Sequence, residues 1–246
     1  MNWSMRDKLQ IKEQKNGKTN LRLYILIWIV LPLIVFVRHG EADNNVKRLL
    51  VGRHIESHLT ECGIQQVKDT GQHLRKFKID KVYVSPVTRA IETAKIICEI
   101  NHLEYETDER LYEIELGDLV GMNYDDVIEK HGNLFLKFYT GDDPILDSYG
   151  IESFSAVKKR IKSLLDDSMK NLPDKNLLFV THLDPIKAAI SIMLGLPPES
   201  LYGWHIRNAS MTILKHENNT LSLSGVNVMG FHRYIEEWIW SDLQKP

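Results

Sequence analysis

The run Leu33–Glu41, which reads LIVFVRHGE, constrains this chain more than any other feature. Five apolar residues, mostly β-branched or aromatic, are typical of a strand buried on both faces inside a parallel sheet. The apolar run ends abruptly at Arg38, His39 and Gly40. The strand therefore delivers a cation, an imidazole and a flexible turn to the carboxyl edge of the sheet, which is where open α/β sheets bind their ligands.

Two later stretches repeat this arrangement. Lys81–Val84 is a short predicted strand followed by SPVTR, which ends at Arg89, and residues 176–180 form another that runs through a threonine into His182. Neighbouring strands would bring four basic side chains to one point, near helix N-termini. Such a point suits a small doubly charged oxyanion, above all phosphate. The four side chains are Arg38, His39, Arg89 and His182.

Both later strands are expected to lead directly into helices. Ser85 and Asp184 are good N-cap residues, and Pro86 and Pro185 would then occupy the first helical positions. This placement puts Arg89 in the first turn of its helix.

At this point the residues resemble the histidine phosphatase superfamily, also called the phosphoglycerate mutase-like fold. Arg38 to Glu41 match its RHGE motif, Ser85 to Ala90 its second arginine motif, and His182 its second histidine. The motifs occur in the family's order between about Leu33 and His232, which covers most of the chain. The resemblance implies an α/β protein, a three-layer α/β/α sandwich with a mainly parallel sheet.

The resemblance also implies roles for individual residues. His39 would attack phosphorus and carry a phosphohistidine, while Arg38, Arg89 and His182 would hold the phosphate oxygens. Glu113 stands at the family's acid/base position, and Asn45 falls where the family often has an asparagine beside the phosphate. The chemistry agrees, because an imidazole with a pKa near 6.5 is largely neutral at pH 7, and phosphoryl transfer needs mainly positioning and charge neutralisation.

The expected activity is that of a metal-independent phosphomonoesterase of the histidine acid phosphatase type, with no cofactor. One alternative is a phosphoglycerate mutase that depends on 2,3-bisphosphoglycerate, because it uses the same groups. A second alternative is a phospho-ligand binding module with low turnover, suggested by Leu183, which replaces the family's usual glycine after the second histidine. No metal site is expected, since His54 and His58 share helical spacing but lack a carboxylate-rich partner motif.

Composition agrees with this interpretation. A net charge of −2 argues against a nucleic-acid binder, which normally carries a basic excess, and leaves a small phosphorylated molecule as the expected partner. The two cysteines, Cys62 and Cys98, show neither CxxC spacing nor the density of a disulfide scaffold. A reducing, cytoplasmic location is therefore the default.

Residues 1–32 are predicted to form an N-terminal extension, basic and then apolar, ahead of one histidine phosphatase domain at 33–246. Once Leu33–Val37 is assigned to a strand, residues 21–32 are shorter than the roughly 20 residues that a membrane-spanning helix needs. Membrane association through residues 21–32 remains an alternative. The tail around Trp238 and Trp240 could dock on the domain or on a second subunit of a homodimer.

Substrate choice is expected to reside in residues 121–151, where Tyr124–Lys130 predicts a short helix and Asn133–Tyr139 supplies aromatic side chains that could cover the site. Amphipathic spacing predicts a helix over Ser153–Met169. Its basic residues, Arg160 among them, are assigned to a solvated outer face. Trp204–Leu214 and Thr220–Val228 are predicted strands, and His205, Asn208 and His232 are interpreted as polar packing residues.

Overall fold

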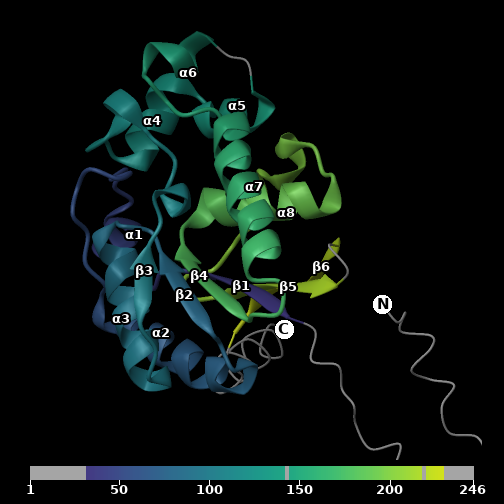
Figure 1. The fold of residues 1–246 in the computed structure, drawn as a ribbon. Helices are drawn as coiled ribbons and strands as arrows, with labels where there is room; N and C mark the ends of the chain where they lie inside the picture. Colours follow the sequence, from purple (N-terminus) through teal and green to yellow (C-terminus); the bar gives the residue numbers. More distant parts are fainter. Residues whose placement is uncertain (1–31, 142–143, 218–219, 230–246) are drawn as a thin grey trace, which may run out of the picture. The chain divides into compact units, whose positions relative to one another are not determined.

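The computed structural model describes residues 32–141, 144–217 and 220–229 (Figure 1). The predicted extension up to residue 31, and the tail from residue 230 with His232, lie outside the described residues. The strands are β1 (Leu33–Arg38), β2 (Lys81–Val84), β3 (Tyr105–Thr107), β4 (Leu177–Thr181), β5 (Met211–Glu217) and β6 (Thr220–Val228). The helices are α1 (Asp43–Lys47), α2 (Glu61–Leu74), α3 (Thr88–Asn101), α4 (Tyr124–His131), α5 (Leu134–Thr140), α6 (Pro144–Ser148), α7 (Phe154–Asn171) and α8 (Leu183–Leu194).

The described strands form one six-stranded sheet in the order β3-β2-β4-β1-β5-β6. Strands β3, β2, β4 and β1 pair in parallel, whereas β5 pairs antiparallel with both β1 and β6. The buried run at residues 34–37 is therefore a central strand, as its apolar character predicted. Because β1 and β4 are neighbours with Arg38 opposite Thr181, the residues that follow them emerge side by side at one edge.

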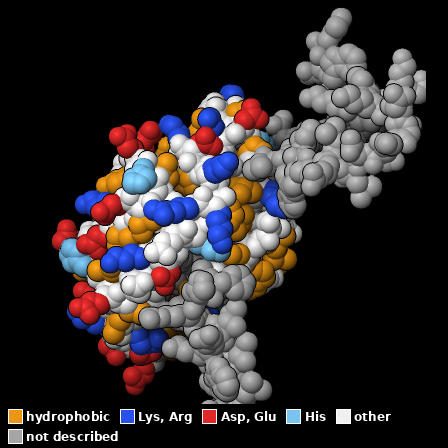
Figure 2. All heavy atoms as spheres, turned by 90° about the horizontal axis from the view of Figure 1, so that it is seen from below, with side chains coloured by type: hydrophobic (Ala, Val, Ile, Leu, Met, Phe, Trp, Pro, Cys, Tyr) orange, Lys and Arg blue, Asp and Glu red, His pale blue; other side chains and the backbone are white. Residues whose placement is uncertain are grey.

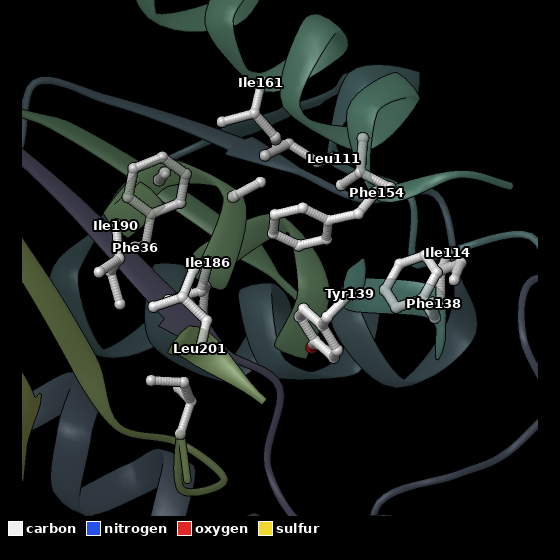
Figure 3. Close-up of a cluster of buried hydrophobic side chains, with 14 of the residues drawn as sticks. Phe36, Leu111, Ile114, Phe138, Tyr139, Phe154, Ile161, Ile186, Ile190 and Leu201 are labelled. Atoms are coloured by element: carbon white, nitrogen blue, oxygen red, sulfur yellow. The ribbon is translucent and has the colours of Figure 1, made fainter. Parts of the chain in front are cut away.

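Helices cover both faces of the sheet and complete the predicted three layers (Figure 1). Alternate residues of β1 belong to two separate hydrophobic clusters, since side chains of a strand alternate between its faces. Val35 and Val37 pack with residues of α2 and α3, and Ile34 and Phe36 pack with residues of α7 and α8. Figure 3 shows part of the second cluster, where Phe36 and Ile161 represent β1 and α7.

Helix capping explains where two of the helices begin. The Thr60 hydroxyl accepts a hydrogen bond from the Gly63 N–H at 2.9 Å at the start of α2. The Ser153 hydroxyl accepts one from the Ala156 N–H at 3.2 Å at the start of α7. Each bond satisfies an N–H group that the first helical turn leaves without a partner.

Three predicted boundaries are wrong. Helix α3 begins at Thr88 after the N-cap Val87, so Ser85 and Pro86 precede the helix. Helix α8 begins two residues earlier than expected, because His182 itself is the N-cap and Asp184 lies inside the helix with Pro185. The strand expected over Trp204–Leu214 starts only at Met211, after a turn that returns the chain to the edge where β1 ends.

No helix among residues 32–141, 144–217 and 220–229 has both the length and the apolar character needed to cross a membrane. On the face shown in Figure 2, basic and acidic side chains are interspersed. This pattern agrees with the small net charge of the chain and differs from the basic stripe of a nucleic-acid binder.

Candidate active site

The ends of three parallel strands place the predicted site residues together. The His39 N–H donates to the Thr181 carbonyl at 2.9 Å, which fixes the chain just after β1 against the end of β4. The Ser85 N–H donates in turn to the Val180 carbonyl at 3.0 Å, which fixes the end of β2. As a result, the rings of His39 and His182 lie with their centroids 5.2 Å apart.

Hydrogen bonds determine which nitrogen of His39 carries the proton. Nδ1 lies 2.8 Å from the Gly40 carbonyl oxygen, which can only accept, so Nδ1 is the protonated nitrogen. Nε2 then holds a lone pair, toward which Nε of Arg89 donates at 3.2 Å. Burial, and next the positive charges of Arg89 and Arg38, lower the pKa of His39 well below 6.5. The imidazole is therefore neutral at pH 7 and has the form of a nucleophile.

Unpaired donors surround this nucleophile. Arg38 donates through Nη1 to the Ile206 carbonyl at 2.5 Å, and Arg89 donates through Nη2 to the Gly52 carbonyl at 3.1 Å. Within the described part of the chain, Arg38 Nε, Arg89 Nη1 and His182 Nδ1 are buried and have no hydrogen-bond partner. Buried arginine N–H groups without an acceptor are uncommon in folded proteins, and an oxyanion would supply the acceptors that Arg38 and Arg89 need.

The pKa values of the two other groups follow from their burial. Burial lowers the pKa of Arg89 to about 10, so its guanidinium stays charged at neutral pH. Burial, followed by the charge of Arg89, lowers the pKa of His182 well below 6.5. His182 is therefore a neutral ring, with its Nε2 2.7 Å from the Ser85 hydroxyl oxygen. The site thus combines two fixed cations with two neutral imidazoles.

Glu113 lies in the loop after the short turn at Glu109–Leu111. Its carboxylate accepts N–H groups of Leu183 and Asp184 at 3.3 Å each, at the N-terminus of α8. Because Glu113 lines the same pocket as Arg38 and His39, the structure brings the predicted acid to the predicted nucleophile.

Asn45 also lines the pocket, although it lies on α1 and not in the loop that the sequence suggested. Its Oδ1 accepts from the Ala42 N–H at 3.0 Å and from Asn208 Nδ2 at 3.2 Å. Asn208 Nδ2 also lies 3.1 Å from the carbonyl oxygen of His39. Asn208 thus joins α1 to the end of β1, a more specific position than the general polar packing expected for it.

The place of Asp184 in the site was missed in the sequence. Asp184 is buried, faces the pocket, and accepts a hydrogen bond from the Tyr139 hydroxyl of α5. Burial, and next the neighbouring carboxylate of Glu113, raise the pKa of Asp184 above its usual range. The signal available in the sequence was an acidic residue between a predicted buried strand and an apolar helix. It was assigned to helix capping, which the helix start at Leu183 excludes.

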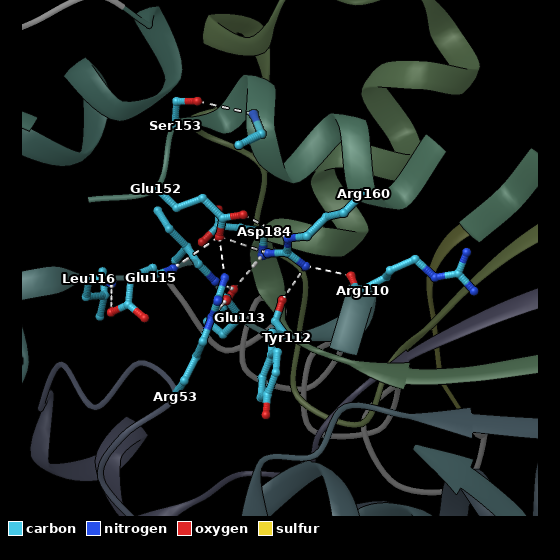
Figure 4. Close-up of polar contacts among 12 residues, drawn as sticks. Arg53, Arg110, Tyr112, Glu113, Glu115, Leu116, Glu152, Ser153, Arg160 and Asp184 are labelled. Carbon is cyan, nitrogen blue, oxygen red and sulfur yellow. Dashed lines mark hydrogen bonds and ion pairs between the residues drawn. The ribbon is translucent and has the colours of Figure 1, made fainter. Parts of the chain in front are cut away.

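A charged cluster supports the loop of Glu113 from behind (Figure 4). Arg53 Nε donates to the Glu113 carbonyl at 2.7 Å, and Arg160 Nη1 donates to the Arg110 and Tyr112 carbonyls at 2.6 and 2.7 Å. Both arginines pair with Glu152, at 2.5 Å for Arg53 and 2.9 Å for Arg160. The assignment of Arg160 to a solvated face is therefore wrong, since its side chain is only 15% exposed.

The two histidines considered as metal ligands do not line the pocket, and each contacts a different carboxylate. His54 Nε2 is 2.7 Å from Glu115, and His58 Nδ1 is 2.7 Å from Glu92. Across the described ranges, no group of three or more His, Cys, Asp or Glu residues has an arrangement that could hold a metal ion.

Comparison with known proteins decides the family, because residues 34–229 match the histidine phosphatase superfamily (branch 1). The chain belongs to this superfamily. The predicted family and fold are thus confirmed. The chain is an enzyme of the histidine phosphatase superfamily.

Relatives within the histidine phosphatase superfamily differ in activity. A 2,3-bisphosphoglycerate-dependent phosphoglycerate mutase of Thermoplasma acidophilum is 33% identical over 80% of this chain and 94% of its own length. Phosphoserine phosphatase 1 of Hydrogenobacter thermophilus is 28% identical over 79% of this chain and 92% of its own. Curated relatives thus include both a mutase and a phosphatase.

Solved structures of histidine phosphatase relatives share the fold. A mycobacterial glucosyl-3-phosphoglycerate phosphatase in complex with VO3 superposes with a TM-score of 0.71 and 26% identity, covering 80% of this chain and 99% of that one. The phosphoserine phosphatase of Entamoeba histolytica in complex with 3-phosphoglyceric acid has a TM-score of 0.70 and 27% identity, covering 81% and 98%.

Proposed function

We propose that this chain is a phosphomonoesterase that works without a metal ion and through a phosphohistidine at His39. The observation that carries the proposal is the tautomer of His39. Because Nδ1–H donates to the Gly40 carbonyl, the lone pair of Nε2 lies on the side of Arg89. A neutral imidazole so placed attacks phosphorus without first losing a proton.

In the first step, Nε2 of His39 forms a bond to phosphorus while the ester P–O bond breaks. The leaving alkoxide takes a proton from the carboxyl group of Glu113, and the phosphoryl group remains on the imidazole. In the second step, water attacks phosphorus and gives a proton to the Glu113 carboxylate. The P–N bond then breaks, its electron pair returns to Nε2, and inorganic phosphate leaves.

Charge stabilisation is the task of the groups around the phosphate. Arg38 and Arg89 neutralise the equatorial oxygens. The Ser85 hydroxyl, which accepts from the Val87 N–H, donates to His182 Nε2, so that Nδ1 of His182 carries the ring proton and donates to a third oxygen. Such fixed donors stabilise a transition state more than they would in water, because they need no reorganisation when charge develops. Asn45, held by Ala42 and Asn208, closes the site on the side of α1.

The deciding experiment measures phosphate release from p-nitrophenyl phosphate and 3-phosphoglycerate with EDTA present. The wild type, His39→Ala and the control His58→Ala are compared. We expect release that resists EDTA, falls at least about a thousand-fold in His39→Ala, and persists in His58→Ala. His58 is a fair control because its side chain is 59% exposed and its ion pair with Glu92 lies outside the pocket.

A mutase is the second candidate, and the relative that is 33% identical is the observation in its favour. Conversion of 3- to 2-phosphoglycerate with a bisphosphate primer, without net phosphate release, would assign the chain to that class. Inactivity in every assay, together with retained phosphate binding, would favour the binding module. The finer assignment to the acid phosphatase type predicts full activity at mildly acidic pH, in line with the lowered pKa of His39 caused by its burial.

We further propose one catalytic domain over residues 33–246, a small phosphorylated molecule as its substrate, and a cytoplasmic location. Cys62 and Cys98 are both free thiols, which suits a reducing compartment. Subcellular fractionation of the full chain and of a chain lacking residues 1–31 tests the location and the membrane alternative. Sedimentation of the two chains tests the homodimer.

A further inference from the structure

The pocket above His39 is larger than a phosphate and a three-carbon acid require. Its volume is about 490 Å³, within the range of about 300–1,000 Å³ that encloses drug-sized ligands. Arg38, His39 and Arg89 line its buried end. The rest of the volume must therefore be explained by the part of the substrate that does not carry phosphate.

The walls beyond the phosphate end are aromatic and aliphatic. Six residues that line them are called the outer pocket: Leu50, Leu116, Tyr124, Phe135, Phe138 and Trp204. Tyr124 of α4 stacks on Phe135 of α5, with ring centroids 4.7 Å apart and an angle of 17° between the rings. Leu50, Phe135 and Trp204 are only partly buried, so they keep apolar surface that a ligand can cover.

The cations of this outer region are already engaged. Arg48 pairs with Asp125 through two hydrogen bonds of 2.6 and 2.7 Å and lies over the Tyr124 ring. Lys187 is buried, donates to the Tyr202 carbonyl at 3.2 Å and lies 4.7 Å from the centre of the Tyr139 ring. Of the described residues that line the pocket, these are the Lys and Arg residues outside the phosphate end.

An acidic side chain in the pocket wall further disfavours a second anionic group on the substrate. Asp184 lines the pocket beside Lys187 and would repel a second carboxylate on the substrate. His205, whose side chain is exposed, also lines the pocket. A substrate that carries an additional anionic group, such as 3-phosphoglycerate, thus meets engaged cations and a buried acid.

We propose that the outer pocket binds the alcohol part of a phosphomonoester that carries an aromatic or other bulky apolar group. This inference rests on the proposed phosphatase function and specifies its substrate class. Burial of an apolar group against these walls stabilises the transition state by removing apolar surface from water. The preferred ester therefore has one anionic group, the phosphate, and an extended apolar remainder.

The test compares 3-phenylpropyl phosphate with n-propyl phosphate, because both have primary alkoxide leaving groups and differ only in the ring. We expect kcat/KM to be at least about tenfold higher for the phenyl compound, and higher than for 3-phosphoglycerate. Phe135→Ala and Trp204→Ala should each lower the ratio of phenyl to propyl. Leu136→Ala is the matched control, since Leu136 neighbours Phe135 on α5, is 38% exposed and does not line the pocket, and should leave the ratio unchanged.

Binding of the phosphonate analogues of both esters, measured by calorimetry on wild-type protein, separates the two levels of the proposal. Tighter binding of 3-phenylpropylphosphonate without turnover of any ester would support the outer pocket and refute the phosphatase. Two results would refute the proposed role of the outer pocket while supporting the phosphatase activity. One is turnover of all esters with a phenyl-to-propyl ratio of kcat/KM near one, and the other is a ratio that Phe135→Ala and Trp204→Ala do not change. Preference for 3-phosphoglycerate would also refute that role.

Discussion

The charged cluster behind Glu113 yields the sharpest test of how the site is held in place. In Arg160→Met a side chain of similar length lacks the guanidinium, so the Arg110 and Tyr112 carbonyls lose their donor. Glu152 then keeps Arg53 and the Glu115 N–H as partners. A buried hydrogen bond left unmade costs about 1–3 kcal/mol. We therefore expect the free energy of unfolding to fall by about 2–4 kcal/mol. The lower value is expected because the side chains of Arg160 and Glu152 are each 15% exposed, so water screens part of their interaction.

The same substitution should affect catalysis selectively. If the loop moves by ~1 Å, Glu113 no longer reaches the leaving oxygen, and such a misplacement costs about a hundredfold in rate. This loss applies to an alkyl phosphate, whose alkoxide needs a proton, and hardly to p-nitrophenyl phosphate, whose phenolate leaves without one. We expect kcat/KM to fall about a hundredfold for 3-phenylpropyl phosphate and less than about tenfold for p-nitrophenyl phosphate.

The assay measures both kcat/KM values and urea unfolding for four variants. Glu113→Gln should show the same dependence on the leaving group, and Arg160→Lys an intermediate one, because an ammonium keeps the charge but cannot reach all the partners. Lys159→Met, on the exposed side of α7, is the matched control. Equal losses for the two substrates in Arg160→Met, or no loss in a variant with lowered stability, would refute a positioning role.

Three further predictions follow from burial and close packing. Because burial keeps the pKa of His39 well below 6.5, lowering the pH from 7 to about 6 should not reduce kcat/KM for p-nitrophenyl phosphate, and a loss of activity with a midpoint near 6.5 would contradict this. Burial and the Glu113 carboxylate raise the pKa of Asp184, so Asp184 becomes negatively charged as the pH rises through neutrality. This charge repels the phosphate, so the KM of phosphate esters should rise with pH, and the rise should be smaller in Asp184→Asn than in the wild type. In Gly63→Ala the new Cβ would lie 1.9 Å from the Glu41 carbonyl oxygen, so the free energy of unfolding measured in urea should fall by about 3 kcal/mol or more. The control Gly203→Ala should change it little, because a Cβ at Gly203 meets nothing within 4 Å.

The parts of the site that lie at strand ends were predictable from the sequence. An apolar strand must be buried, and the residue that ends it must reach the edge of the sheet, so Arg38, His39 and His182 were found from their position alone. Arg89 followed from a helix start close behind another strand. Glu113 and Asn45 depended on the family resemblance, because a lone acidic or amide side chain in a loop carries no local signal of its neighbours.

The remaining residues could not be predicted because their roles depend on distant contacts. Arg160 has the helical position of a surface residue, yet it is held inward by carbonyls 48 and 50 positions earlier in the chain. Tyr139 and Asp184 meet across 45 positions. Local capping preferences also misplaced the start of α8, since Asp184 is a good N-cap in isolation but His182 occupies that position.

The stacked pair Tyr124 and Phe135 belongs to one uninterrupted stretch of chain, α4 to α6, whereas the nucleophile and its cations come from the sheet and from α3. The segment α4 to α6, which covers part of the pocket, is thus separate in the chain from the residues that bind phosphate. Exchange of this stretch between relatives would alter which alcohol is accepted and leave the machinery for phosphoryl transfer in place. Changes in this segment, which supplies Tyr124, Phe135 and Phe138 of the outer pocket, therefore alter specificity with no need to rebuild the chemistry beneath it.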